Sequence, residues 1–108
     1  MKRRIYLAGP MTGLIGLNYA AFHEAARLLR AEGYEVASPA ELTAPNQDPT
    51  WEDWMRAALA LLLTCDGVAL LPGWAQSRGA CEEQRLASWV LRMDTLTVRE
   101  WLTGEADR

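Results

Sequence analysis

Four short runs of apolar, β-forming residues are spaced along the chain. Each is followed closely by Gly, Pro or polar residues, which is typical of a buried strand that ends at a turn. The predicted strands cover residues 5–8, 34–37, 66–71 and 96–98. The third run is the most apolar, which predicts a central position in the sheet.

Between these runs, apolar residues recur at the spacing of amphipathic helices. The predicted helices extend from an N-cap at Asn18 to Gly33, from about residue 51 to 64, and from a cap at Ser77 to about residue 91. Thr50 precedes Asp53 by three residues, as in a capping box. A final helical turn is predicted at residues 100–102. Strict alternation of strand and helix predicts a parallel sheet of four or five strands in an open α/β sandwich.

Composition and charge exclude several classes of protein. The chain has 108 residues, which predicts a single domain over residues 1–108. Its net charge of −3 lacks the basic excess of a protein that binds a nucleic acid duplex. No apolar stretch approaches the length of a membrane span. We therefore expect a cytoplasmic protein with no nucleic acid duplex and no membrane as partner.

The metal-ligating residue types are sparse. The 2 cysteines, Cys65 and Cys81, form neither a disulfide framework nor a four-ligand zinc pattern. The 1 histidine, His23, excludes a His-rich metal site and any mechanism that needs two imidazoles. No metal site is predicted.

Open α/β sheets bind ligands at the carboxyl ends of their strands. That rule selects three loops, at residues 9–16, 38–50 and 72–78. The first loop is rich in glycine and allows a backbone to approach a sugar or phosphate, although a plain strand-to-helix turn explains it equally well. Its candidate binding residues are Gly9, Pro10, Met11, Thr12 and Gly13. In the third loop, the Trp74 indole either stacks on a base or closes the turn.

The start of the third predicted helix has the features of an anion site. Ser77, Arg78 and Gly79 combine free backbone N–H groups, the positive end of the helix dipole and a guanidinium. These three residues are candidate ligands of a phosphate.

Glu83 shares a helix face with Leu86, Ala87 and Val90, which predicts that its carboxylate is buried. Burying a lone carboxylate costs several kcal/mol, so the residue needs a partner or a function. The alternatives without a catalytic role for Glu83 are a salt bridge to Arg56 or Arg85, or a solvated position at the helix edge.

Two residues near the strands are further candidates. Tyr6 in the first strand either packs in the core or points its phenol into the site. Asp66 either caps a turn before the third strand or carries a proton. Four of the tryptophans fit packing in the core or at a subunit interface: Trp51, Trp54, Trp89 and Trp101.

Several strings, over about residues 4 to 98, resemble the nucleoside 2-deoxyribosyltransferase superfamily. They are Ile5-Tyr6-Leu7-Ala8-Gly9-Pro10, Cys65-Asp66 before an apolar strand, and Ser77-x-Gly79-x-x-x-Glu83-x-x-x-Ala87. The sequence is most similar to a small branch common in phages and prophages, which shares Leu-Ala-Gly-Pro-Met-Thr-Gly and Gly-Trp-x-x-Ser-Arg-Gly-Ala.

The resemblance implies a flavodoxin-like fold and cleavage of the N-glycosidic bond of a nucleoside or nucleotide. Glu83 would be the nucleophile, Tyr6 its orienting group, and Asp66 the group that handles the proton of the departing base. Ser77 beside Arg78 favours a nucleoside 5′-monophosphate. The resemblance also implies a homodimer or larger homo-oligomer, and no metal or organic cofactor.

Two other classes of function stay open. The chain is alternatively a nucleotide-binding module without turnover, which senses or sequesters a nucleotide during phage infection. It is otherwise a small oligomeric scaffold whose tryptophans form the interface.

Overall fold

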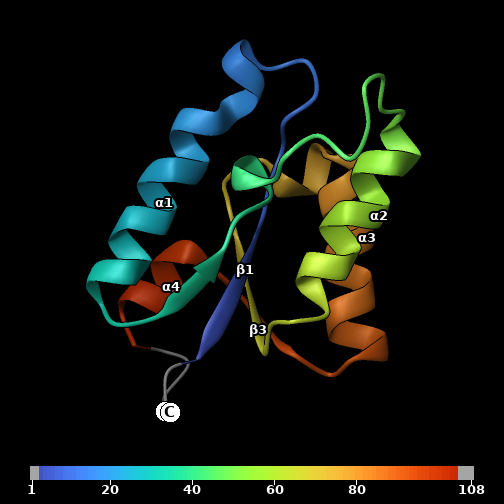
Figure 1. Cartoon of the computed structure of the whole chain (residues 1–108). Helices are drawn as coiled ribbons and strands as arrows, with labels where there is room; N and C mark the ends of the chain where they lie inside the picture. Colours follow the sequence, from blue (N-terminus) through green and yellow to red (C-terminus); the bar gives the residue numbers. More distant parts are fainter. Residues whose placement is uncertain (1–2, 105–108) are drawn as a thin grey trace.

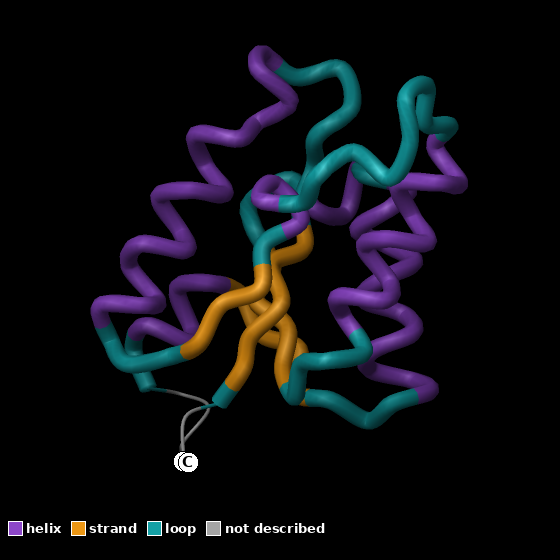
Figure 2. The backbone as a smooth tube through the Cα atoms, viewed as in Figure 1, coloured by secondary structure: helices purple, strands orange, loops and turns teal. Residues whose placement is uncertain are grey.

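In the computed structural model, which describes residues 3–104, the strands form one parallel sheet between two layers of helices (Figures 1 and 2). The strands are β1 (Arg4–Ala8), β2 (Glu35–Ala37), β3 (Gly67–Leu70) and β4 (Asp94–Thr97). Their order is β2-β1-β3-β4 in a 4-stranded sheet. The predicted parallel α/β sheet is confirmed, and so is the inner position of the third strand.

The helices divide between the two faces of the sheet (Figure 1). α1 (Tyr19–Ala31) and α4 (Val98–Leu102) cover one face, while α2 (Trp51–Leu62) and α3 (Arg78–Arg85) cover the other. α3 continues as the π-helical turn η4 (Leu86–Val90). Short 3-10 turns lie in the connections: η1 (Ile15–Asn18), η2 (Pro39–Glu41) and η3 (Trp74–Gln76).

Alternation along β1 sends its side chains into two separate cores. Ile5 and Leu7 pack with Phe22 of α1 and Trp101 of α4. Tyr6 points to the opposite face, where α2 and α3 supply the packing. Its neighbours across the sheet are Ala37 of β2 and Val68 of β3. The first strand therefore presents a phenol to the α2–α3 side of the sheet.

Two of the three predicted helix caps are confirmed. Thr50 and Asp53 form a reciprocal capping box at the start of α2. The Ser77 hydroxyl accepts a hydrogen bond from the Ala80 N–H at 3.2 Å and caps α3. Asn18 occupies the predicted N-cap position of α1, but it has a φ of 62° and its side chain makes no cap hydrogen bond. Its side-chain amide instead donates to the Pro10 carbonyl at 3.0 Å and ties the loop after β1 to the start of α1.

Trp101 closes the core beneath the sheet on the α1 side. Its side chain is 1% exposed, and its indole N–H donates to the Val68 carbonyl at 2.8 Å. A Cβ at Gly67 would lie 2.9 Å from this indole, so only glycine fits the start of β3. Core packing is confirmed for Trp101, whereas Trp89 is 76% exposed.

Within residues 3–104, no helix has the length and apolar character that crossing a membrane requires.

Candidate active site

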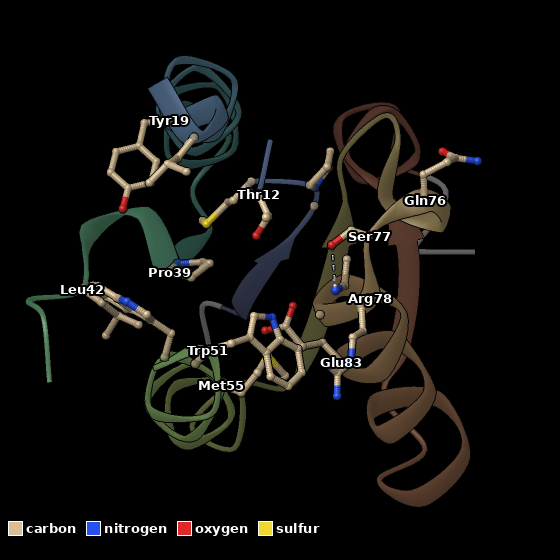
Figure 3. Close-up of a pocket in the computed structure, with 18 residues that line it drawn as sticks. Thr12, Tyr19, Pro39, Leu42, Trp51, Met55, Gln76, Ser77, Arg78 and Glu83 are labelled. Carbon is tan, nitrogen blue, oxygen red and sulfur yellow. Dashed lines mark hydrogen bonds between the residues drawn. The ribbon is translucent and has the colours of Figure 1, made fainter. Parts of the chain in front are cut away.

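A cavity of about 690 Å³ opens at the carboxyl edge of the sheet (Figure 3). This volume is within the range of small-molecule sites in proteins. Its walls come from the loop after β1, the segment after β2, the first half of α2 and the start of α3. All three loops that the sequence selected therefore contribute residues to the cavity wall. The cavity lies at the edge of the sheet where a ligand site was predicted.

Glu83 is the acidic group of this cavity. The Ser77 cap fixes where α3 begins, and the helix then turns residue 83 toward the sheet. Its side chain is 5% exposed, so the predicted burial is confirmed. The Tyr6 phenol, from the strand beneath, donates a hydrogen bond to Glu83 Oε2. Figure 3 shows the carboxylate pointing into the space between the surrounding elements.

No salt bridge neutralises Glu83 within residues 3–104. The two arginines that the sequence offered as partners are engaged elsewhere: Arg56 lies 3.5 Å from Asp53, and Arg85 lies 2.7 Å from Glu82. The predicted ion pairs with Arg56 and Arg85 are thus wrong. Both arginines lie on the solvent side of their helices, where each meets an acid one turn away.

Burial controls the proton affinity of both groups. Desolvation raises the pKa of Glu83 to about 7, against the opposing effect of the Tyr6 hydrogen bond. Burial, together with the negative charge of Glu83, raises the pKa of Tyr6 well above its ordinary value. Tyr6 therefore stays a hydrogen-bond donor at neutral pH. Glu83 is close to half-ionised there, so it is able to act as a nucleophile or to exchange a proton.

The start of α3 forms the positively charged wall. The N–H groups of Arg78 and Gly79 lie in the first turn of the helix, where no acceptor one turn earlier exists. The Arg78 guanidinium lies over the Trp51 ring, 3.9 Å from its centroid. A Cβ at Gly79 would meet the Met55 sulfur at 3.3 Å, so glycine keeps α3 close to α2. Together with Ser77, these residues line the cavity.

The glycine-rich loop after β1 lies on the other side. A Cβ at Gly9 would lie 2.7 Å from the Leu71 Cβ, so the loop depends on glycine to pass the end of β3. Gly13 lies outside the cavity wall and turns the chain with a φ of 82°. The loop residues that line the cavity are Gly9, Pro10, Met11 and Thr12.

The structure does not bring Asp66 to this site. The residue directly precedes β3, so it lies at the amino edge of the parallel sheet, opposite the cavity. Its carboxylate accepts a hydrogen bond from the Arg4 backbone N–H at 3.3 Å and lies 3.5 Å from the Arg3 guanidinium. These contacts tie Asp66 to the start of β1 and keep its carboxylate away from the cavity.

Trp74 is also outside the cavity. The residue contributes to the wall of a separate apolar hollow with residues of α1 and α4, including Ala25, Val98 and Leu102, and it packs against the core cluster on the α2–α3 side. The predicted contact between Trp74 and a base is therefore not available in this cavity.

The aromatic wall of the cavity was not predicted from the sequence. Trp51 and Trp54, which the sequence predicts in core or interface packing, both line the cavity with Met55 and Ala58 of the same helix. The spacing of these four residues, at one helical face, was the available signal. The remaining lining residues that sequence reasoning missed are Leu17, Tyr19, Pro39, Leu42, Gln76 and Ala80.

Within the described residues, no three His, Cys, Asp or Glu side chains are grouped closely enough to hold a metal ion.

Comparison with known proteins gives one family and one fold. The family described as "Domain of unknown function (DUF4406)" matches residues 3–94. No curated protein matches the chain. A solved structure of the 2-deoxyribosyltransferase from the psychrotolerant bacterium Bacillus psychrosaccharolyticus is similar, with a TM-score of 0.65 and 24% identity. The match covers 86% of this chain and 70% of that one, and it shows a common α/β fold.

Proposed function

The chain belongs to the DUF4406 family, and we propose that it cleaves the N-glycosidic bond of a nucleoside 5′-monophosphate through Glu83. One observation carries this proposal. A buried carboxyl group, with the Tyr6 phenol as its hydrogen-bond partner and no cation beside it within residues 3–104, faces a cavity of nucleotide size. The fold that the chain shares with a 2-deoxyribosyltransferase supports the same chemistry.

The proposed reaction begins at the anomeric carbon. The Glu83 carboxylate attacks C1′ while the bond from C1′ to the base nitrogen breaks, and the electron pair of that bond leaves with the base. The transition state has oxocarbenium character, which an adjacent carboxylate stabilises. Tyr6 holds the attacking carboxylate in place. Water, or a second base, then takes the sugar from Glu83 and restores the carboxylate.

The proposed phosphate site is the start of α3. A helix rises about 1.5 Å per residue, so the backbone of Arg78 lies roughly 7.5 Å along the axis from that of Glu83. This spacing is on the scale of a nucleotide from its 5′-phosphate to C1′. Ser77, Arg78 and Gly79 would hold the phosphate through N–H groups and the guanidinium.

The sugar and base would occupy the rest of the cavity. Residues 9–12 would lie against the sugar, and the indoles of Trp51 and Trp54 would contact the base. Asp66 and Trp74 have no part in this proposal.

Base release measured by chromatography tests the proposal. The protein is incubated with ribo- and deoxyribonucleoside 5′-monophosphates and with the matching free nucleosides. The variants are Glu83→Gln, which keeps the volume of the side chain, and Glu82→Gln, a control at the exposed neighbour. Release by the parent protein and by Glu82→Gln, with loss in Glu83→Gln, supports the proposal; release that survives in Glu83→Gln refutes it.

Other results of this experiment would favour the two alternative functions. Binding without product, unchanged in Glu83→Gln, would indicate a nucleotide-binding module. A nucleotide at 100 times its dissociation constant adds about 2.7 kcal/mol to stability, so a melting temperature that no nucleotide raises would indicate a scaffold.

We also propose that the protein belongs to the branch common in phages and prophages. We propose further that it is cytoplasmic and forms a homo-oligomer. Exposed apolar side chains at one end of the α2–α3 layer support self-association: Leu63, Trp89, Val90 and Leu91. Light scattering of the parent protein and of a Trp89→Ser variant would measure the oligomeric state.

A further inference from the structure

When an N-glycosidic bond breaks, the negative charge that develops on the departing base must be neutralised. An ordinary base leaves with the electron pair of the bond, and an enzyme usually supplies a proton to it. Such general acid catalysis contributes roughly 10²- to 10⁴-fold to the rate. A site for ordinary nucleotides is therefore expected to contain an acid besides its nucleophile.

The cavity holds a single carboxyl group. Of the described residues that line it, Glu83 is the one acid, and none is a histidine. The other polar lining groups are hydroxyl, phenol, indole, amide and guanidinium groups, which are poor proton donors at neutral pH. The lining residues that carry them are Thr12, Tyr19, Trp51, Trp54, Gln76, Ser77 and Arg78.

Glu83 cannot fill both roles in one step. As a nucleophile it must be ionised, and it then has no proton to give. Asp66, the group that the sequence offered for this task, lies at the opposite edge of the sheet, where Arg3 and the Arg4 N–H hold it. Among the described residues, none besides Glu83 is placed to give the departing base a proton.

We propose that the substrate is a nucleotide whose base carries a fixed positive charge, such as a pyridinium nucleotide or an N7-alkylated purine nucleotide. This inference rests on the proposed function and names the substrate class of the same site. A cationic base becomes neutral when it takes the electron pair of the broken bond, so it needs no proton.

The charges of the cavity match such a zwitterionic nucleotide. Arg78 and the start of α3 face the phosphate end, and Glu83 lies about one and a half helical turns further along. The aromatic face of Trp54 attracts a flat cation, whereas the Trp51 ring already has the Arg78 guanidinium 3.9 Å from its centroid. A cation beside Glu83 also favours the ionised carboxylate, which is the attacking form.

The step balances without a further reactant except water. An oxygen of the Glu83 carboxylate bonds to C1′, and the pair of the C1′–N bond cancels the positive charge of the base. Water then attacks C1′, the ester bond breaks back to the carboxylate, and one proton passes to solvent. The products are the free neutral base, the sugar phosphate and a proton.

Matched pairs of nucleotides test the inference. We would measure kcat/KM for base release from 7-methylguanosine 5′-monophosphate and guanosine 5′-monophosphate at pH 6, where the methylated base keeps its positive charge, after subtracting the spontaneous release of each. Nicotinamide mononucleotide and its reduced, uncharged form make a second pair. The expected result is a preference for the cationic member of roughly 100-fold or more, the scale of general acid catalysis. Glu83→Gln is expected to lose the activity and Glu82→Gln to keep it.

The pH profile gives an independent readout. With nicotinamide mononucleotide, whose pyridinium charge does not titrate, kcat/KM is expected to rise as Glu83 ionises, through its pKa of about 7, and to stay level at higher pH. A falling limb above that plateau would reveal a proton donor and overturn the inference.

The outcomes separate the two proposals. Comparable release from neutral and cationic nucleotides, lost in Glu83→Gln, overturns the inference and leaves the proposed function standing. No release from any nucleotide overturns both.

Discussion

Glu83→Gln should stabilise the folded protein at alkaline pH. The pKa of the carboxyl group rises from its ordinary value of 4.5 to about 7 on folding, mainly because the side chain is desolvated. At about 1.4 kcal/mol per pH unit, this difference corresponds to roughly 3 kcal/mol. A glutamine has nearly the same shape, accepts the same hydrogen bond from Tyr6 and carries no charge to bury.

The sign follows from which state binds the proton. Between pH 4.5 and about 7, the folded state holds a proton on Glu83 that the unfolded chain has released. The stability that this proton contributes is fully present below pH 4.5 and is lost as the pH rises through about 7. The glutamine variant has no such loss. The two proteins should be similarly stable near pH 4.5, and the variant should be more stable by about 3 kcal/mol at pH 8.5.

Denaturant titrations across this pH range measure the difference directly. Subtracting the variant from the parent removes the pH dependence of the other ionisable groups. For a chain of this size, the stabilisation at pH 8.5 should raise the melting temperature by roughly 10 °C or more. Glu82→Gln, at the exposed neighbour, should change stability by no more than about 0.5 kcal/mol. A flat difference between parent and Glu83→Gln would refute the reasoning, because it would mean that Glu83 is as solvated in the folded protein as in the unfolded one.

Three other substitutions test separate parts of the structure. Arg78→Ala should lower kcat/KM for nucleoside 5′-monophosphates by roughly 10- to 100-fold, the value of a hydrogen bond to a charged group, while release from free nucleosides stays unchanged. Asp66→Asn should leave base release unchanged and reduce stability by less than about 1 kcal/mol, because its contacts with Arg3 and Arg4 are exposed; a loss of turnover would restore it as a proton carrier. Gly9→Ala places a Cβ at 2.7 Å from Leu71 and should destabilise the fold by roughly 1–3 kcal/mol, measured by urea unfolding; unchanged stability would show that the loop after β1 moves freely.

The fold was predictable because its two inner strands, β1 and β3, are buried on both faces. A parallel sheet between two helix layers needs near-continuous apolar runs, and such runs are visible in the sequence. The pattern of apolar positions also identified Glu83 as a candidate, since an acid among the apolar residues of a helix face is unusual. Its true partner, Tyr6, lies 77 residues away, and the two were linked by a resemblance to a known superfamily and not by any local pattern.

The wrong predictions for Asp66 and Trp74, and the unexpected position of Trp51, have physical reasons. Asp66 precedes its strand, so the rule that ligands bind at carboxyl ends already argued against it. Trp74 and Trp51 could not be separated by position alone, since each lies in or beside a connection at the carboxyl edge. Which indole enters the cavity depends on how α2 packs against α3, and this is decided by tertiary contacts such as that of Gly79 with Met55.

The order of the strands has a consequence for biosynthesis. β1, the first strand to leave the ribosome, is an inner strand of the sheet and pairs with β3, whose residues are made more than sixty positions later. β1 can pair with β2 and pack against α1 once these have emerged, but its other edge stays unpaired until β3 is made. The contact between Tyr6 and Glu83 forms later still, after α3 has been synthesised. A chain that ends before α3 therefore lacks Glu83, and the site forms only once β1, β3 and α3 are all present.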